Sequence, residues 1–134
     1  KYNNNFIFVD GEDDQLIDFK IASKGLYFKR ELYMEKKNLL PINFAIPQNK
    51  IINKINLKTP NILAPLIPGK KKTYIYNNED EYNKMYQNSL FAITYKKAGW
   101  DCYRHYEILM NGCIPIFLNI ENLYQDKIKK GELL

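Results

Sequence analysis

A strand, a short loop, a helix and a second strand follow one another in residues 89–118, and this pattern restricts the fold more than any other feature of the chain. The apolar residues 90–95 predict a buried strand, and residues 113–118 predict another. Between them, residues 102–111 predict a helix that Asp101 caps and that Gly112 ends. Parallel strands joined through one helix form a right-handed crossover. We therefore expect residues 91–95 and 114–118 to be parallel neighbours.

The remainder of the chain predicts further strands and one more helix. Asn78 and Glu81 have the spacing of a capping box at the start of a helix that runs to about Asn88. The expected strands or extended segments are residues 6–9, 25–28, 41–47 and 73–76, and the proline-containing residues 48–69 predict a loop with short strands. The sequence thus predicts an α/β protein, a Rossmann-like three-layer domain with a mainly parallel sheet, as one domain over residues 1–134.

The composition excludes several classes of protein. Hydrophobic residues make up 46% of the 134 residues and charged residues 26%, as in ordinary globular domains. No apolar run is long enough to predict a membrane span. The net charge of +5 suits nucleic acid, but 18 of the 20 cationic residues are Lys, and they are scattered among 15 acidic residues. We expect no nucleic-acid partner, although a phosphate ligand stays open.

Two cysteines, Cys102 and Cys113, lie at opposite ends of the predicted helix. A helix of about ten residues would separate them by roughly 15 Å, whereas a disulfide needs Cα atoms about 4.4–6.8 Å apart. The sequence therefore predicts two free, buried thiols and a reducing compartment such as the cytoplasm.

The loop before the predicted helix has the residues that an anion site needs. Lys96 and Lys97 supply positive charge, Gly99 allows close approach of the backbone, and the helix that begins at Asp101 offers free N–H groups. Arg104 in the first turn could bind a phosphate through two N–H groups. The competing interpretation is an ordinary surface ion pair between Arg104 and Glu107, three residues apart on one helix face.

The same stretch resembles the signature of exostosin-like glycosyltransferases. The similarity rests on an apolar strand that begins after Ser89, a short polar loop, Arg104, Glu107, and then Gly-Cys-Ile-Pro at residues 112–115. It is specific over roughly thirty residues. The upstream segments 8–11, 28–32 and 41–44 also resemble members of this family, of the type found in giant viruses and bacteria.

The resemblance implies a metal-independent GT-B glycosyltransferase, in which two Rossmann-like domains hold a nucleotide-sugar donor and transfer its sugar to a glycan or another hydroxyl acceptor in polysaccharide biosynthesis. The donor is a substrate, and neither a cofactor nor a metal is implied. Glu107 would contact the donor ribose or sugar, while Arg104 and Lys97 would hold the leaving diphosphate. The chain supplies about one domain, so we expect a separate N-terminal GT-B domain. Residues 1–47 are either inter-domain sequence or the first strands of this domain.

Other charged groups carry alternative hypotheses. Lys29 and Arg30 follow a predicted strand and are either further phosphate contacts or a charged strand end. The acidic residues 10 and 12–14 are either a metal-binding motif or a solvated turn, and the turn is favoured because carboxylates alone do not define a metal geometry. For the whole chain, the alternatives to a transferase are a non-catalytic nucleotide-sugar-binding module and, less favoured, a basic nucleic-acid-binding domain.

Overall fold

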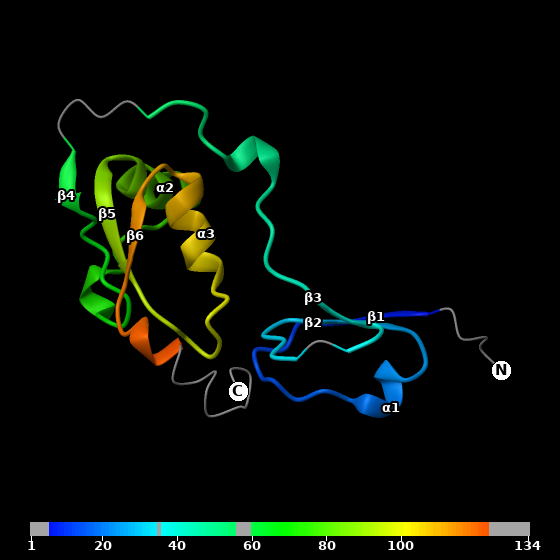
Figure 1. Cartoon of the computed structure of the whole chain (residues 1–134). Helices are drawn as coiled ribbons and strands as arrows, with labels where there is room; N and C mark the ends of the chain where they lie inside the picture. The colour runs from blue at the N-terminus through cyan, green and yellow to red at the C-terminus, as the bar shows by residue number, and fades with distance from the viewer. Residues whose placement is uncertain (1–5, 35, 56–59, 124–134) are drawn as a thin grey trace. The chain divides into compact units, whose positions relative to one another are not determined.

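The computed structural model describes residues 6–34, 36–55 and 60–123, and these divide into two units, each built on one three-stranded sheet (Figure 1). Of the described residues, unit 1 holds 6–34, 36–43, 97–101 and 121–123, and unit 2 holds 44–55, 60–96 and 102–120. All strands in both sheets are parallel to their neighbours. The predicted α/β class with a parallel, Rossmann-like arrangement is therefore confirmed.

Unit 1 contains the sheet β1-β2-β3 and one short helix. Its elements are β1 (Ile7–Asp10), α1 (Phe19–Ala22), β2 (Leu26–Lys29) and β3 (Leu39–Pro41). The side chain of Asp18 caps α1 by accepting hydrogen bonds from the N–H groups of Lys20 and Ile21 at 2.9 and 3.1 Å. The strands predicted at residues 6–9 and 25–28 are present, but the segment predicted at 41–47 contributes only its first residue to β3.

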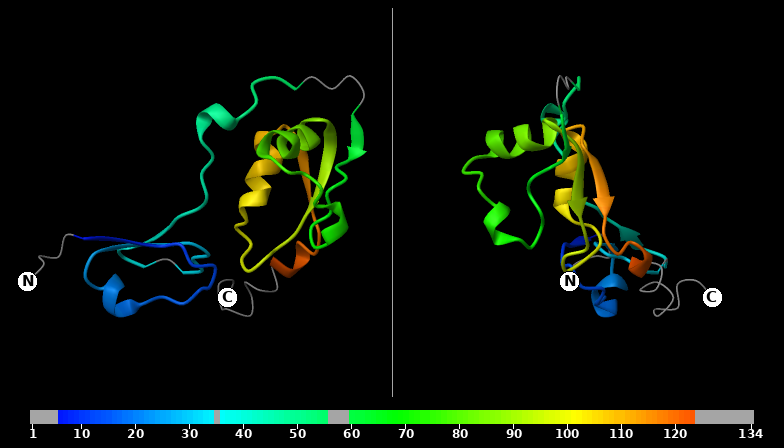
Figure 2. Two further views of the ribbon diagram at one scale, coloured as in Figure 1. Left: turned by 180° about the vertical axis from the view of Figure 1, so that it is seen from behind. Right: turned by 90° about the vertical axis from the view of Figure 1, so that its left-hand side faces the viewer.

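Unit 2 contains the sheet β4-β5-β6. Its elements are the 3-10 turns η1 (Gln48–Lys50) and η2 (Lys71–Thr73), the helices α2 (Glu79–Gln87) and α3 (Tyr103–Met110), and the strands β4 (Asn61–Leu63), β5 (Ser89–Thr94) and β6 (Ile114–Phe117). β5 and β6 pair in parallel from Phe91 with Ile114 to Thr94 with Phe117. The right-hand view of Figure 2 shows the two strands side by side. The predicted strand–helix–strand unit is confirmed.

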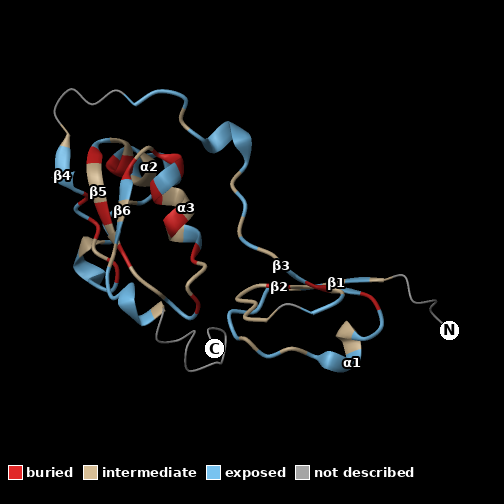
Figure 3. Ribbon diagram, in the orientation of Figure 1, coloured by how far each residue is buried: buried red, intermediate tan, exposed pale blue. Residues whose placement is uncertain are grey.

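The core of unit 2 lies where α2 and α3 meet one face of the sheet, and Figure 3 shows the buried residues gathered on these elements. Its buried members are Ala64, Leu66, Met85, Tyr86, Ala92, Ile108 and Cys113. Because the strands follow one another in chain order, right-handed crossovers place both helices on the same face. Side chains alternate along a strand, so the other face carries apolar residues such as Ile114 and Ile116, which are exposed.

The capping residues of α2 and the end of α3 follow the sequence prediction. The Asn78 side chain accepts a hydrogen bond from the Glu81 N–H at 2.9 Å, as a capping box requires, although the Glu81 carboxylate accepts from Asn77 at 3.3 Å and not from Asn78. Gly112 has φ of +71°, the left-handed conformation that ends a helix.

Two local predictions are wrong, and each has a physical reason. Residues 73–76 form no strand, because Thr73 closes a turn: its hydroxyl accepts from the Ile67 N–H at 3.0 Å and donates to the Lys70 carbonyl at 2.8 Å. Asp101 does not cap α3, whose N-cap is Cys102. The Asp101 carboxylate instead lies 3.5 Å from Nε of Arg30, an attraction between full charges that a sequence pattern does not reveal.

Both thiols are free and buried, as predicted. Burial raises the pKa of Cys113 to about 11, so this thiol stays protonated at neutral pH. Among the described residues, no helix has the length and apolar character needed to cross a bilayer.

Candidate functional site

Arg104 lies in the first turn of α3, close to the carboxyl end of β5. Its guanidinium is 5.9 Å from the centre of the Tyr95 ring, which packs against it. The NH1 atom is buried and has no hydrogen-bond partner within the described part of the chain. A buried N–H group without an acceptor costs free energy, and a cation at the positive end of a helix adds to that cost. Arg104 is therefore a half-buried cation with one N–H donor that no acceptor of the described residues uses.

Glu107 lies one turn further along α3 and is held by Tyr82 of α2. Tyr82 donates its hydroxyl proton to Oε2 of Glu107 at 3.0 Å, and the hydroxyls of Tyr82 and Tyr86 are 3.2 Å apart. Burial raises the pKa of Glu107 above its usual value, while the Tyr82 hydrogen bond and the Arg104 charge oppose the rise. Within the described residues, Arg104 and Glu107 do not form an ion pair, so the simple surface-pair interpretation does not describe them.

The phenols around Glu107 stay protonated at physiological pH. Burial, more than any other cause, raises the pKa of Tyr86 to about 12, and it raises that of Tyr82 further still, with help from the Tyr86 and Glu107 contacts. Tyr82 is thus a permanent hydrogen-bond donor to Glu107. One carboxylate oxygen of Glu107 is occupied in this way, and the carboxylate retains acceptor capacity for a hydroxyl ligand.

The loop between β5 and α3 divides between the two units. Lys96 is half-buried in unit 2, whereas Lys97, Gly99 and Asp101 belong to unit 1, where Lys97 is exposed and Gly99 is buried. The structure therefore brings Arg104 and Glu107 together on α3, and it groups Lys97, Gly99 and Asp101 with the strands of unit 1.

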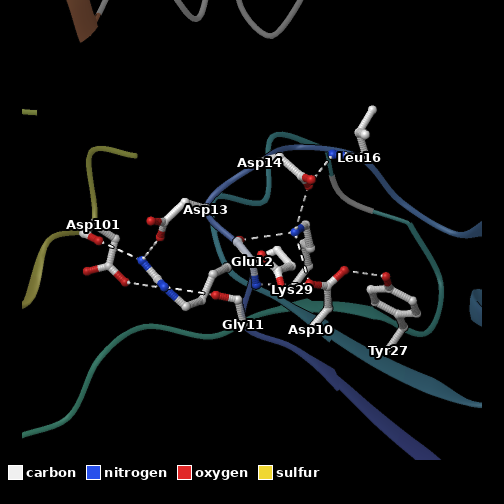
Figure 4. Close-up of polar contacts among 10 residues, drawn as sticks. Asp10, Gly11, Glu12, Asp13, Asp14, Leu16, Tyr27, Lys29 and Asp101 are labelled. Carbon is white, nitrogen blue, oxygen red and sulfur yellow. Dashed lines mark hydrogen bonds and ion pairs between the residues drawn. The ribbon is translucent and has the colours of Figure 1, made fainter. Parts of the chain in front are cut away.

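Lys29 is fully buried in unit 1, at the carboxyl end of β2 (Figure 4). Its ammonium donates to Oδ1 of Asp10 at 3.1 Å, to the carbonyl of Glu12 at 3.2 Å and to Oδ1 of Asp14 at 3.3 Å. An ammonium has three N–H donors, so all of them are used. Lys29 thus holds the acidic loop after β1 against the sheet.

Arg30 is engaged in a similar way. Its guanidinium lies 2.6 Å from the Asp13 carboxylate and donates to the carbonyls of Gly11 and Asp101 at 2.9 and 2.8 Å. The predicted phosphate contacts Lys29 and Arg30 are therefore placed beside carboxylates of their own chain. These cations neutralise the acidic loop that also suggested a metal motif.

Asp10 is the centre of this cluster. Its Oδ2 accepts the Tyr27 hydroxyl proton at 2.6 Å and its Oδ1 accepts the Glu12 N–H at 3.0 Å. Burial alone would raise the pKa of Asp10, but the hydrogen bonds from Tyr27, Glu12 and Lys29 together lower it. In the described residues, no three or more His, Cys, Asp or Glu side chains are grouped as metal ligands would be.

Three groups near these sites were not among the sequence candidates. Tyr82 and Tyr86 have the spacing of a core-facing stripe. That pattern does not show that the Tyr82 hydroxyl reaches a carboxylate on another helix or that the Tyr86 hydroxyl contacts Tyr82. Glu31 accepts a hydrogen bond from the Asp101 N–H, a contact between residues far apart in the sequence. Only its position in the family-like segment 28–32 drew attention to it.

Comparison with protein-family models, curated proteins and solved structures returns no match to this chain. Any functional assignment therefore depends on its own residues.

Proposed function

We propose that this chain is the donor-binding part of a metal-independent GT-B glycosyltransferase, which transfers a sugar from a nucleotide-sugar donor to a hydroxyl acceptor. The observation that carries the proposal is the buried NH1 of Arg104 in the first turn of α3, which meets no hydrogen-bond acceptor among the described residues. In parallel α/β sheets, ligands bind beyond the carboxyl ends of the strands, where helix N-termini favour phosphate groups. The resemblance of residues 89–119 to exostosin-like enzymes supports the same assignment.

In this proposal Arg104 binds the diphosphate of the donor. The bond between the sugar and the diphosphate breaks, the acceptor oxygen bonds to the sugar, and the acceptor proton is released. Negative charge grows on the diphosphate as its bond to the sugar breaks, so a fixed guanidinium stabilises the transition state more than the bound substrate. Lys96 and Lys97 add positive charge to the loop that precedes α3.

Glu107 contacts a ribose or sugar hydroxyl of the donor. The Tyr82 hydrogen bond fixes the carboxylate in place, so it meets the ligand with little loss of side-chain entropy. This contact is the same in the ground state and in the transition state. Glu107 therefore contributes to donor affinity rather than to the rate of the chemical step.

The test compares sugar transfer by the wild type with transfer by Arg104→Ala, Arg104→Lys and Glu107→Gln. Arg104→Ala should lower kcat by roughly 10²–10³-fold, since one charged donor to the leaving group is lost. Arg104→Lys should recover part of the rate, because an ammonium cannot contact two phosphate oxygens as a guanidinium does. Glu107→Gln should weaken donor binding with a smaller effect on kcat.

The donor for these assays is identified first, by measuring which of the UDP-, GDP- and CDP-sugars raises the Tm of the protein. Wild-type turnover by Arg104→Ala would contradict the proposed role of the guanidinium. Donor binding without any transfer would favour the nucleotide-sugar-binding module instead.

A further inference from the structure

The connection from β1 to β2 leaves part of the sheet in unit 1 uncovered. A crossover between parallel strands usually carries a helix that packs on the sheet. Here the helix is the single turn α1, and none of its residues is buried (Figure 3). A cavity of about 840 Å³ lies between this connection and the sheet, wholly within unit 1. Its volume falls in the range of small-molecule binding sites, roughly 300–1,000 Å³.

The wall of the cavity offers aromatic and aliphatic surface to a ligand. Phe8 and Tyr27 line it from the sheet, and their ring centres are 4.9 Å apart. Leu16 and Phe19 line it from the connection and are 76% and 50% exposed. A ligand with an apolar body would remove from water the apolar surface that the protein leaves exposed there.

Negative charge surrounds the same cavity. Its charged lining residues are Asp10, Glu12, Asp14, Asp18 and Lys20. Within the described residues, Glu12 and Asp18 form no ion pair. Negative charge is therefore in excess even when the buried Lys29 beside Asp10 is counted. This excess is opposite in sign to the net charge of the chain, +5, so the cavity attracts cations although the protein as a whole is basic.

The Tyr27 hydroxyl is exposed to the field of two of these carboxylates. It donates to Oδ2 of Asp10 at 2.6 Å (Figure 4). Burial raises the pKa of Tyr27, and the Asp10 hydrogen bond and the charges of Asp10 and Asp18 raise it further, to about 12. The phenol therefore stays protonated at neutral pH, and the carboxylates of Asp10 and Asp18 act on the same part of the cavity.

An ammonium group of the chain itself contacts the aromatic wall. Nζ of Lys36 lies 4.8 Å from the centre of the Phe19 ring, at the distance of a cation–π interaction. Aromatic rings and carboxylates together favour an ammonium ion, because the ring faces attract the cation and the carboxylates balance its charge. A neutral or anionic ligand of the same shape would gain neither interaction.

We propose that the cavity of unit 1 binds an organic cation, with its ammonium group among the carboxylates and its apolar body against the aromatic wall. The cavity lies at the carboxyl end of β1, the end at which parallel α/β sheets bind their ligands. None of the residues proposed to bind the sugar donor lines it. The inference therefore stands independently of the proposed function.

The first experiment compares three ligands that share a phenethyl group and differ in charge: phenethylamine, phenethyl alcohol and hydrocinnamate. Calorimetric titration of the wild type should show the amine binding at least about tenfold more tightly than the other two, since only the amine gains the cation–π contact and the carboxylates. The amide NMR signals of Gly11 and Lys20, which line the cavity, should shift with the amine. The signal of Ala92, in the core of unit 2, should not shift.

The second experiment removes the charges one at a time. Asp18→Asn keeps a residue that caps α1 equally well, and Glu12→Gln changes an exposed side chain. Each should weaken phenethylamine binding about two- to fivefold, and the double variant about tenfold. Glu121→Gln is the matched control, because it removes an equal charge from an exposed side chain of unit 1 outside the cavity, and it should bind as the wild type does.

The third experiment tests the aromatic wall. Phe19→Leu keeps an apolar side chain but removes the ring, so it should weaken binding of the amine about threefold and leave that of phenethyl alcohol unchanged. An equal loss for both ligands would contradict the cation–π contact.

Equal affinities of the wild type for the three ligands, or no binding of the amine, would overturn the inference. So would unchanged amine binding in the double variant, or NMR shifts confined to unit 2. The ligand comparison uses the wild type alone, so the inference stays testable even if a variant fails to fold.

Discussion

Lys29 of unit 1 and Arg104 of unit 2 differ in the acceptors that their buried N–H groups meet. In unit 1, the buried Lys29 has a protein acceptor for each of its three N–H groups. In unit 2, Arg104 has a buried N–H group with no acceptor in the described residues. A satisfied cation holds a loop in place, whereas an unsatisfied one lowers stability unless a ligand binds it. Whether a buried N–H group has an acceptor therefore distinguishes a structural cation from a candidate functional one, which residue type alone does not do.

The carboxylates differ in the same way. Asp10 is surrounded by donors, and its pKa is lowered as a result. Glu107 has one tyrosine donor and a buried setting, so its pKa is raised. The two units should therefore respond in opposite directions to the same change of pH.

The largest expected effect comes from replacing the satisfied cation. Lys29→Met leaves Asp10 without its ammonium and frees the acidic loop, so it should lower the free energy of unfolding by about 3 kcal/mol. Urea unfolding, followed by Trp100 fluorescence, measures this loss in unit 1.

Arg104→Met is the matched control, since it also replaces a cation with an apolar chain of similar length. It breaks no ion pair of the described residues and removes a buried N–H group that has no acceptor among them, so it should leave the free energy of unfolding unchanged or raise it. Similar losses in the two variants would remove the distinction between the units.

The next effect is an acid dependence in unit 1. Because the folded state lowers the pKa of Asp10, its contribution to stability is complete above the unfolded value of 3.8 and is lost as the pH falls through the folded value. Asp10→Asn should be less stable than the wild type at pH 7, and the two should converge as the pH falls below about 4. Unfolding by urea at a series of pH values measures this, and a constant difference at all pH values would contradict it.

The smallest effect has the opposite sign and belongs to unit 2. The folded state raises the pKa of Glu107, so stability is fully present below the unfolded value of 4.5 and falls as the pH rises through the folded value. Glu107→Gln keeps a hydrogen-bond acceptor for Tyr82 and has no charge to bury. It should raise the Tm by a few degrees at pH 7–8 and leave it unchanged near pH 4. A lower Tm at pH 7 would show that the ionised carboxylate stabilises the fold.

The sequence predicts β5, α3 and β6 because their signals are local. Apolar runs define the strands, and Gly112 ends the helix through its own backbone conformation. The capping prediction at Asp101 fails for a non-local reason: its carboxylate is attracted by Arg30, which lies 71 positions earlier. The strand predicted at residues 73–76 fails because the Thr73 hydroxyl closes a turn with Ile67 and Lys70, and Tyr76 then packs against Tyr82 from a loop.

The candidate site was predictable to a similar extent. Helical periodicity places Arg104 and Glu107 on one face of α3, but it cannot show that a tyrosine of α2 holds the carboxylate. Glu31 had no sequence signal of its own, because a positive φ at a residue other than glycine follows from contacts rather than from the residue type.

The division of the chain between the two units also sets an order in which contacts can form. Within each sheet, paired residues are only 12 to 28 positions apart, so each sheet can assemble from neighbouring segments soon after they are synthesised. Asp101 is synthesised much later. Its carbonyl accepts a hydrogen bond from Arg30, and its N–H donates to Glu31. Until then Arg30 can contact only earlier residues such as Asp13 and Gly11, and the Glu31 carboxylate lacks the Asp101 N–H that it binds in the folded unit. Unit 1 is therefore begun by the first third of the chain, and the loop before α3 and residues 121–123 join it only later.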